Sequence, residues 1–310
     1  MARTVSSPEF SRNYGFWSED EQRALLNARV AIAGVGGDGF QLGLKLARMG
    51  VSRFSIADPE VFEPENVNRV EGAAVSSFGR NKAEVFRERV LDIDPDAEVE
   101  VFLDGVTEDN IEPFMRGASL VLDESELTKP EIGTLIARRA RTQGIPDLLV
   151  MNVGFAAQVT SFAPGSRWTF ERFMGFAPET PLDEIADAGV DLARCLPYIP
   201  PYTDLRSLQA VLGEDGAPPA ALPSISAGVD LASAIGSTQA FLHLTAGVAN
   251  RRRSPVWAPR VAYTDAYLLR TRILRAGRAS HVRHLLLAAG RQRLGANPLG
   301  SHRLPAISGR

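Results

Sequence analysis

The sequence predicts an α/β fold with a mostly parallel sheet flanked by helices. Three observations support this. Between residues 29 and 151, short β-branched or aliphatic runs alternate with helical patterns, as in consecutive βαβ units. A turn with four glycines joins the first run to an amphipathic helix. The chain of 310 residues is also long enough to bury a substantial core.

Each expected strand is a short run dominated by apolar side chains. The runs are RVAIA (29–33), RFSIA (53–57), EVEVF (98–102), SLVLD (119–123) and LLVMN (148–152). Helical patterns lie between them, at roughly 40–49, 79–92, 108–116 and 129–143. Gly50 and Gly144 follow two of these helices, where a C-terminal cap requires a positive φ angle.

The pattern changes after residue 152. QVTSFAPG is typical of a strand that ends in a turn, and we expect it to begin an antiparallel extension of the sheet. The irregular segment 163–223 is too long for an ordinary connection, so we interpret it as a crossover or lid region. Further along, the sequence predicts a buried helix at 224–249, a strand in RVAYTDAYL (260–268) and a last helix at 281–292.

Composition and charge exclude several classes of protein. The net charge of −3 gives no indication of a polyanion-binding surface, so no nucleic-acid partner is expected. The longest apolar stretch, near 224–249, is interrupted by Asp230 and His243 and predicts no membrane span. The single cysteine, Cys195, excludes an intrachain disulfide and a CxxC zinc site. No signal-peptide pattern is present, so the expected compartment is cytoplasmic.

The glycine turn predicts a nucleotide site in a Rossmann-like fold. Gly34, Gly36 and Gly39 match G-x-G-x-x-G between a strand and a helix. Glycine lets the backbone approach phosphates closely, and the helix N-terminus presents free N–H groups to them. Asp58 ends the second strand, where an acid accepts hydrogen bonds from ribose hydroxyls. These residues leave NAD, FAD, S-adenosylmethionine and ATP open.

The residues after Asp58 favour a triphosphate. Asn66 and Arg69 follow it, and Lys82 stands at a helix start in FGRNK. A nicotinamide cofactor needs no such concentration of cations, whereas a triphosphate that loses pyrophosphate does.

Taken in order, the motifs resemble those of the ubiquitin-activating-type adenylyltransferases, the family of ThiF, MoeB and HesA. The resemblance rests on Arg12 in FSRNYG, Gly34 to Gly39, Asp58 with Glu60, Asn66 with Arg69, Gly79 with Lys82, and Asp123 with Glu126. It implies an ATP-dependent adenylyltransferase that activates a carboxylate as an acyl-adenylate and releases pyrophosphate. The implied substrate is the C-terminus of a small carrier protein or precursor peptide.

The resemblance also implies roles for individual residues. Arg69 and Lys82 would act on the phosphates, and Glu126 takes the position of the family's Mg²⁺-binding aspartate. Arg12 matches an arginine that reaches the ATP of a partner subunit, which implies a homodimer. Cofactor binding is implied for Gly34, Gly36, Gly37, Gly39, Asp58, Glu60, Asn66, Arg69, Lys82 and Asp123.

Four features of the sequence bear on these implications. Asp38 stands in the glycine turn where the family usually carries an apolar residue, and an acid beside phosphates is unfavourable unless it points away. Val70 replaces a common glutamine, and the paired CxxC zinc motifs are absent, so no zinc is expected. Cys195 falls where some members carry a reactive cysteine that takes over the acyl group; the alternative is a small buried hydrophobe.

We therefore expect five segments. They are an N-terminal segment that reaches a dimer partner (1–28), an ATP-binding core (29–162), the crossover or lid region (163–223), a helix and strand that complete the fold (224–280), and a C-terminal helix and tail (281–310). Two alternative functions stay open: an NAD(P)-dependent oxidoreductase and a non-catalytic partner subunit. The identity of the carboxylate also stays open, and an RNA-linked carboxylate is among the possibilities.

Overall fold

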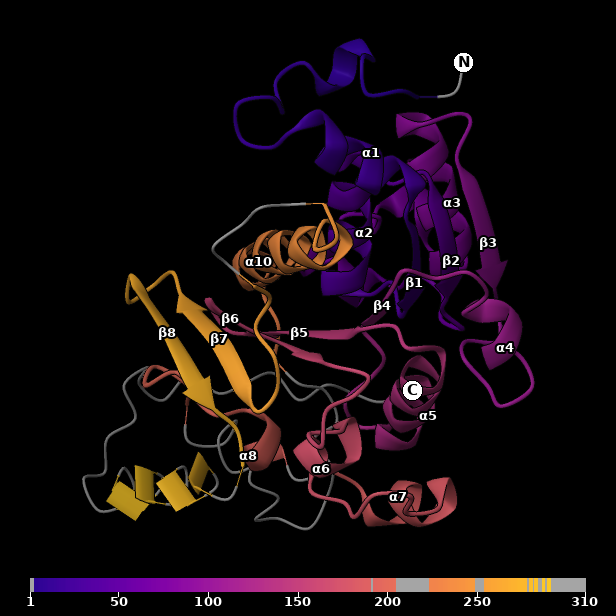
Figure 1. The fold of residues 1–310 in the computed structure, drawn as a ribbon. Helices are drawn as coiled ribbons and strands as arrows, with labels where there is room; N and C mark the ends of the chain where they lie inside the picture. Colours follow the sequence, from indigo (N-terminus) through magenta and orange to yellow (C-terminus); the bar gives the residue numbers. More distant parts are fainter. Residues whose placement is uncertain are drawn as a thin grey trace.

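One sheet of eight described strands runs through the computed structural model (Figure 1). The structure describes residues 3–190, 192–204, 223–248 and 254–277, with short stretches between 279 and 290. The strand order is β3 (Glu98–Phe102), β2 (Arg53–Ala57), β1 (Arg29–Ala33), β4 (Leu120–Asp123), β5 (Asp147–Val153), β6 (Ala156–Phe162), β7 (Arg260–Asp265) and β8 (Arg270–Arg275). The first five strands are parallel, whereas β6, β7 and β8 each run antiparallel to the preceding strand. The predicted mostly parallel sheet with an antiparallel extension is confirmed.

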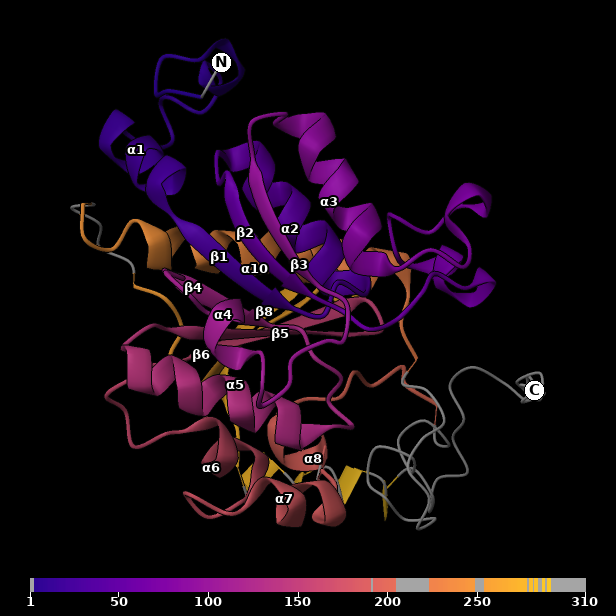
Figure 2. The same ribbon diagram turned by 90° about the vertical axis from the view of Figure 1, so that its right-hand side faces the viewer.

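Helices cover both faces of this sheet (Figure 2). One face carries α2 (Gly37–Met49), α3 (Lys82–Ile93) and α10 (Ser226–Leu244), whose apolar side chains share a core with the strands. The other face carries α4 (Ile111–Phe114) and α5 (Pro130–Gln143) over a smaller core. A sheet of parallel strands needs both faces covered because its strands are apolar on both sides.

An aromatic cluster fixes the start of α2 against the segment that follows β2. Phe40, directly after the glycine turn, is fully buried. Its ring meets Phe62 and Phe86 edge-on, with centroids 6.0 and 5.4 Å apart. Such pairs add about 0.5–1.5 kcal/mol beyond the area they bury. The turn and the segment after Asp58 are therefore held at a fixed separation.

The segment 163–223 is only partly irregular. Its described part forms three short helices, α6 (Phe170–Met174), α7 (Leu182–Ala188) and α8 (Leu192–Cys195), on the α5 side of the sheet (Figure 2). Phe170, Phe173 and Met174 are buried there with Cys195. Residues 205–222, the basic run 251–253 and most of the expected C-terminal helix and tail lie outside the described residues.

The strand expected at 260–268 is confirmed as far as Asp265, but its predicted end is wrong. The chain leaves β7 at Asp265, turns through Leu269 at a φ of 51°, and returns as β8. The Asp265 carboxylate accepts a hydrogen bond from Leu268 N at 2.9 Å, which stabilises the turn. Among the described helices, none combines the length and apolarity needed to cross a membrane.

Candidate nucleotide-binding site

An open cavity of about 730 Å³ lies at the carboxyl ends of β1, β2 and β4. In the sheet, β2 lies on one side of β1 and β4 lies on the other, so the strand order reverses at β1. Parallel α/β sheets bind ligands at such a switch point. The wall contains nine residues that the sequence predicts for the site: Gly34, Gly36, Gly37, Asp58, Glu60, Asn66, Arg69, Lys82 and Glu126. The fold thus brings together residues that span 93 positions of the sequence, from 34 to 126.

The glycines of the turn serve different purposes. Gly34 has a φ of 92°, and a Cβ on it would lie 2.2 Å from the carbonyl oxygen of Glu124. A Cβ on Gly39 would lie 2.1 Å from the carbonyl oxygen of Gly34. A Cβ on Gly36 would meet nothing within 4 Å. Gly34 and Gly39 are therefore required for packing of the backbone, whereas Gly36 borders open space at the cavity wall.

Asp58 links the turn to the segment that follows β2. Its Oδ2 accepts a hydrogen bond from Val35 N, and its Oδ1 accepts one from Glu60 N, both at 2.8 Å. Burial raises the pKa of Asp58, while the Glu60 N–H and the charge of Lys82 oppose that rise. The carboxylate is held rigidly at the position expected for a ribose partner.

Asn81 fixes the first turn of α3 and with it Lys82. The Asn81 Oδ1 accepts from Ala83 N at 2.8 Å as a helix N-cap, and its Nδ2 donates to the Asp58 carbonyl at 3.0 Å. Lys82 is buried, and its ammonium pairs with the carboxylate of Glu60. The Lys82 ammonium is therefore held near Asp58, the acid that is expected to bind a ribose.

Arg69 comes from a different element. It follows the 3₁₀ helix η2 (Pro64–Asn68), where Asn66 Oδ1 accepts a hydrogen bond from Glu63 N at 3.1 Å. Arg69 Nη1 donates to Asn68 Oδ1 at 2.9 Å and to the Glu65 carbonyl at 3.1 Å. These contacts hold the guanidinium at the wall of the cavity, so it and Lys82 approach the cavity from two elements.

The end of β4 supplies acids to the cavity. Asp123 is buried and does not line it; its Oδ1 accepts from Ser125 Oγ at 2.5 Å and thereby shapes the turn. Glu126 is exposed, lines the cavity and lies 3.7 Å from Lys129. Within the described residues, no three His, Cys, Asp or Glu side chains gather as a metal site. One exposed carboxylate still fits Mg²⁺, which commonly takes one or two carboxylates together with phosphate oxygens.

Asp38 points away from the nucleotide cavity. Its Oδ2 accepts hydrogen bonds from Asn152 Nδ2 at 2.8 Å and from Asn152 N at 3.2 Å. The residue lines a neighbouring cavity of about 200 Å³. Burial raises the pKa of Asp38 to about 7, although Asn152 and the charge of Arg69 oppose the rise. Asp38 therefore does not line the cavity in which the sequence predicts the phosphates.

Asp38→Asn is expected to make the protein less sensitive to pH. The folded pKa of about 7 lies above the ordinary value of 3.8, so the folded state holds more protons between these values. The free energy of unfolding therefore falls as the pH rises from about 4 to about 7. The variant keeps an oxygen for Asn152 and loses the charge that faces Glu124 and Arg69. Its unfolding free energy at pH 8 should rise, on the order of 2 kcal/mol.

Urea denaturation at pH 4.5, 6 and 8 measures this effect. Asp20→Asn is the control, since the Asp20 side chain is 72% exposed. A smaller dependence on pH is expected for Asp38→Asn only. An unchanged dependence would show that Asp38 ionises normally in the folded state.

Arg12 and Cys195 are not brought to this cavity. The N-terminal segment packs at the opposite edge of the sheet, where Arg3 donates to the carbonyl of Ala47 at the end of α2. Arg12 is exposed there. Cys195 is 0% exposed in the cluster that contains Phe173, where a thiol is shielded from a substrate. The structure therefore assigns neither residue to the cavity of its own subunit.

The sequence interpretation missed several wall residues. Asp104, Glu124, Ser125 and Lys129 line the cavity. Asp104 follows β3, and the other three follow β4, so the rule that ligands meet the carboxyl ends of parallel strands could have found them.

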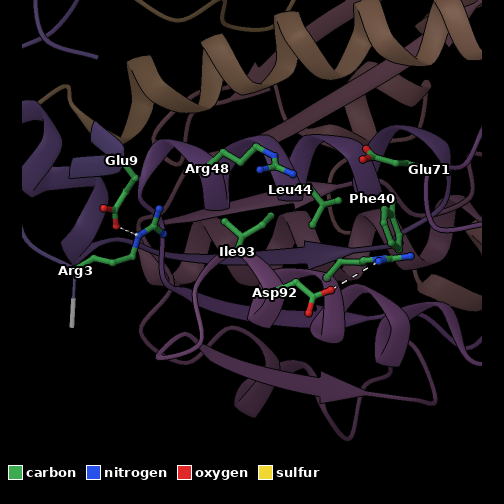
Figure 3. A pocket seen from close by; sticks show the side chains of 9 residues that line it. Arg3, Glu9, Phe40, Leu44, Arg48, Glu71, Asp92 and Ile93 are labelled. Carbon is green, nitrogen blue, oxygen red and sulfur yellow. Dashed lines mark hydrogen bonds and ion pairs between the residues drawn. The ribbon is translucent and has the colours of Figure 1, made fainter. Parts of the chain in front are cut away.

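A second open cleft, of about 600 Å³, lies between the N-terminal segment, α2 and α3 (Figure 3). Several of its charged side chains form ion pairs with one another: Arg3 lies 3.2 Å from Glu9, and Arg89 lies 3.7 Å from Asp92. The glycine turn and Asp58 do not line it. It is therefore not the candidate site.

The parallel sheet, the glycine turn and the cation-bearing cavity at the switch point define a nucleotide-binding protein of the α/β class. More particularly, the chain belongs to the ThiF family, whose model matches residues 10–282.

Two curated relatives cover about half of this chain or less. The tRNA threonylcarbamoyladenosine dehydratase of Bacillus subtilis is 35% identical over 119 residues, 38% of this chain and 47% of that protein. The sulfur carrier protein ThiS adenylyltransferase of Escherichia coli is 26% identical over 147 residues, 47% of this chain and 57% of that protein. The chain thus spans about half the length of the curated relatives it matches. The crystal structure of E. coli MccB with ATP shares the fold, with a TM-score of 0.63 at 15% identity, over 88% of this chain and 73% of that one.

Proposed function

We propose that this chain is an ATP-dependent adenylyltransferase. Its reaction joins a carboxylate to the α-phosphorus of ATP, which gives an acyl-adenylate and releases pyrophosphate. The observation that carries the proposal is the convergence of Asp58, Arg69 and Lys82 on one cavity with an open floor at Gly36. Asp58 would hold the ribose, and the two cations would neutralise the charge that builds on the phosphates. The fixed geometry of the cavity would place the substrate carboxylate in line for attack on the α-phosphorus.

Mg²⁺ is part of this proposal. The cavity wall carries more acids than bases: the bases are Arg69, Lys82 and Lys129, and the acids are Asp58, Glu60, Glu63, Glu65, Asp104, Glu124 and Glu126. A triphosphate in such a wall needs further positive charge. Glu126 would hold the ion, which supplies that charge beside the phosphates.

The substrate and the assembly are also proposals. ThiS adenylyltransferase is named for a carrier protein, and one crystal structure holds MccB with MccA. On that basis we propose the C-terminus of a small carrier protein or a peptide as the carboxylate, in a cytoplasmic enzyme. Arg12 is exposed at the edge of the sheet opposite its own cavity, which supports a homodimer in which it serves the partner.

An ATP–pyrophosphate exchange assay with a panel of peptides and carrier proteins tests the reaction. Arg69→Ala should lower the exchange rate by about 100-fold, because it removes a phosphate-neutralising charge. Arg48→Ala, an exposed cation on α2, is the matched control and should leave the rate unchanged. Equal rates in the two variants would remove Arg69 from the site.

A thermal-shift measurement separates the proposal from its alternatives. ATP with Mg²⁺ at 100 times its Kd should stabilise the protein by about 2.7 kcal/mol, and EDTA should reduce this effect. Stabilisation by NAD alone would instead indicate an oxidoreductase. Stabilisation by neither nucleotide would indicate a non-catalytic subunit.

A further inference from the structure

A small cavity adjoins the phosphate end of the nucleotide cavity. It measures about 200 Å³ and shares Gly36, Gly37, Arg69, Glu124 and Ser125 with its neighbour, but Asp58 does not line it. A group inside it would therefore lie beside the phosphates and away from the ribose. Its volume admits only a small group, such as the end of a side chain.

Two residues of its wall, Asp38 and Glu124, each carry a side-chain oxygen that lacks a hydrogen-bond donor. Asp38 Oδ1 and Glu124 Oε1 are buried and have no hydrogen-bond partner among the described residues. A buried carboxylate oxygen without a donor is costly, so this wall favours a ligand that carries N–H or O–H groups. It disfavours a second carboxylate, which would meet two acids.

The free oxygen of Asp38 has a fixed direction. Asn152 holds the other oxygen through two hydrogen bonds. Ser224 Oγ in turn donates to Asn152 Oδ1 at 2.8 Å. This chain of contacts leaves Oδ1 as the one oxygen of Asp38 without a hydrogen-bond donor among the described residues.

We propose that the small cavity receives the nitrogen of a primary amine that attacks the acyl-adenylate, with Asp38 Oδ1 as its hydrogen-bond and proton acceptor. This inference rests on the proposed function. A primary amine has two N–H donors for the two free acceptors, whereas a hydroxyl or thiol has one. In the step, the ammonium form of the amine first loses one proton to solvent. The nitrogen lone pair then forms the C–N bond, and the C–O bond to AMP breaks with its electrons on the phosphate oxygen. One nitrogen proton passes to Asp38.

The electrostatics around Asp38 agree with this role. A general base works best when its pKa lies near the working pH, and burial raises the pKa of Asp38 to about 7. The charge of Arg69 opposes the rise. Glu124 also lines the cavity, and burial, together with the nearby Asp38, raises its pKa well above the ordinary value.

Binding of ethylamine to the AMP-saturated protein tests the recognition. The side-chain amide of Asn152 donates to Asp38, so its resonance in asparagine-labelled protein reports on the cavity; Asn152→Ala assigns it. Ethylamine should shift this resonance saturably at pH 7.5. Ethanol, with one donor, and tetramethylammonium, with a charge but no N–H group, should not. Asp38→Asn should weaken ethylamine binding at least about tenfold and change AMP affinity by less than twofold.

Three results would overturn the inference: equal shifts from ethylamine and tetramethylammonium, equal shifts from ethylamine and ethanol, or unchanged ethylamine affinity in Asp38→Asn. Failure of AMP to bind would contradict the proposed function itself. The three results above contradict only the amine site, so the two failures are distinguishable. With a carboxylate that supports exchange, Asp38→Asn should slow ethylamine-dependent AMP release about 100-fold and leave pyrophosphate exchange intact. A parallel loss of both rates would contradict the assigned step.

Discussion

Lys82→Ala is expected to raise the Kd for ATP by about 10- to 100-fold and to slow pyrophosphate exchange by about 100- to 1,000-fold. The ammonium is buried beside Asp58 and pairs with Glu60, so its removal leaves two acids without a counter-charge next to the phosphates. Repulsion then adds to the lost attraction. Isothermal titration calorimetry measures the affinity, and the exchange assay measures the rate.

Lys45→Ala is the matched control for this variant. Lys45 lies on α2, 3.5 Å from Gln41 Oε1, and lines neither the nucleotide cavity nor its smaller neighbour. Its affinity for ATP should equal that of the wild type. Equal effects of the two substitutions would contradict a specific role for Lys82.

Gly34→Ala is expected to lower the free energy of unfolding by about 3–5 kcal/mol. The φ of 92° is strained for alanine, and its Cβ would collide with the carbonyl of Glu124, a backbone atom that cannot move aside cheaply. Gly36→Ala should cost less than Gly34→Ala, since its φ is −72° and a Cβ there meets nothing within 4 Å.

The two glycine variants separate stability from binding. Chemical denaturation should place Gly34→Ala well below the wild type and Gly36→Ala close to it. Calorimetry should show at least tenfold weaker ATP binding for Gly36→Ala, because the added methyl projects into the space expected for a phosphate. Normal ATP affinity in Gly36→Ala would place the phosphates elsewhere in the cavity.

Strands were the most predictable part of the fold. RVAIA and RFSIA are strands over the residues expected from their apolar runs. The helix expected at 108–116 is only Ile111–Phe114, with Pro113 inside it, which cannot donate a backbone hydrogen bond. The strand expected at 260–268 ends at Asp265, where the chain turns. The apolar residues after Asp265 suggested a longer strand, whereas a hydrogen bond from Leu268 N to the Asp265 carboxylate stabilises the turn.

The candidate site was predictable where it depends on strand ends. Gly34, Asp58 and Glu126 each follow or end a parallel strand, and such ends meet at one edge of the sheet. Asp123 satisfies the same rule and yet faces inward, since Ser125 binds its carboxylate. The direction of a side chain at a strand end depends on neighbours that a local pattern does not contain.

The sequence alone determined the parallel sheet, the glycine turn and the approximate position of the cavity, because these follow from local periodicity and from residues at strand ends. Tertiary structure decided the direction of Asp38, whose partner Asn152 lies 114 residues away. It also decided the burial of Cys195 in the cluster that contains Phe173 and the different packing requirements at Gly34, Gly36 and Gly39. Each of these depends on contacts between segments that are distant in the sequence, and such contacts form only when the helices and strands pack together.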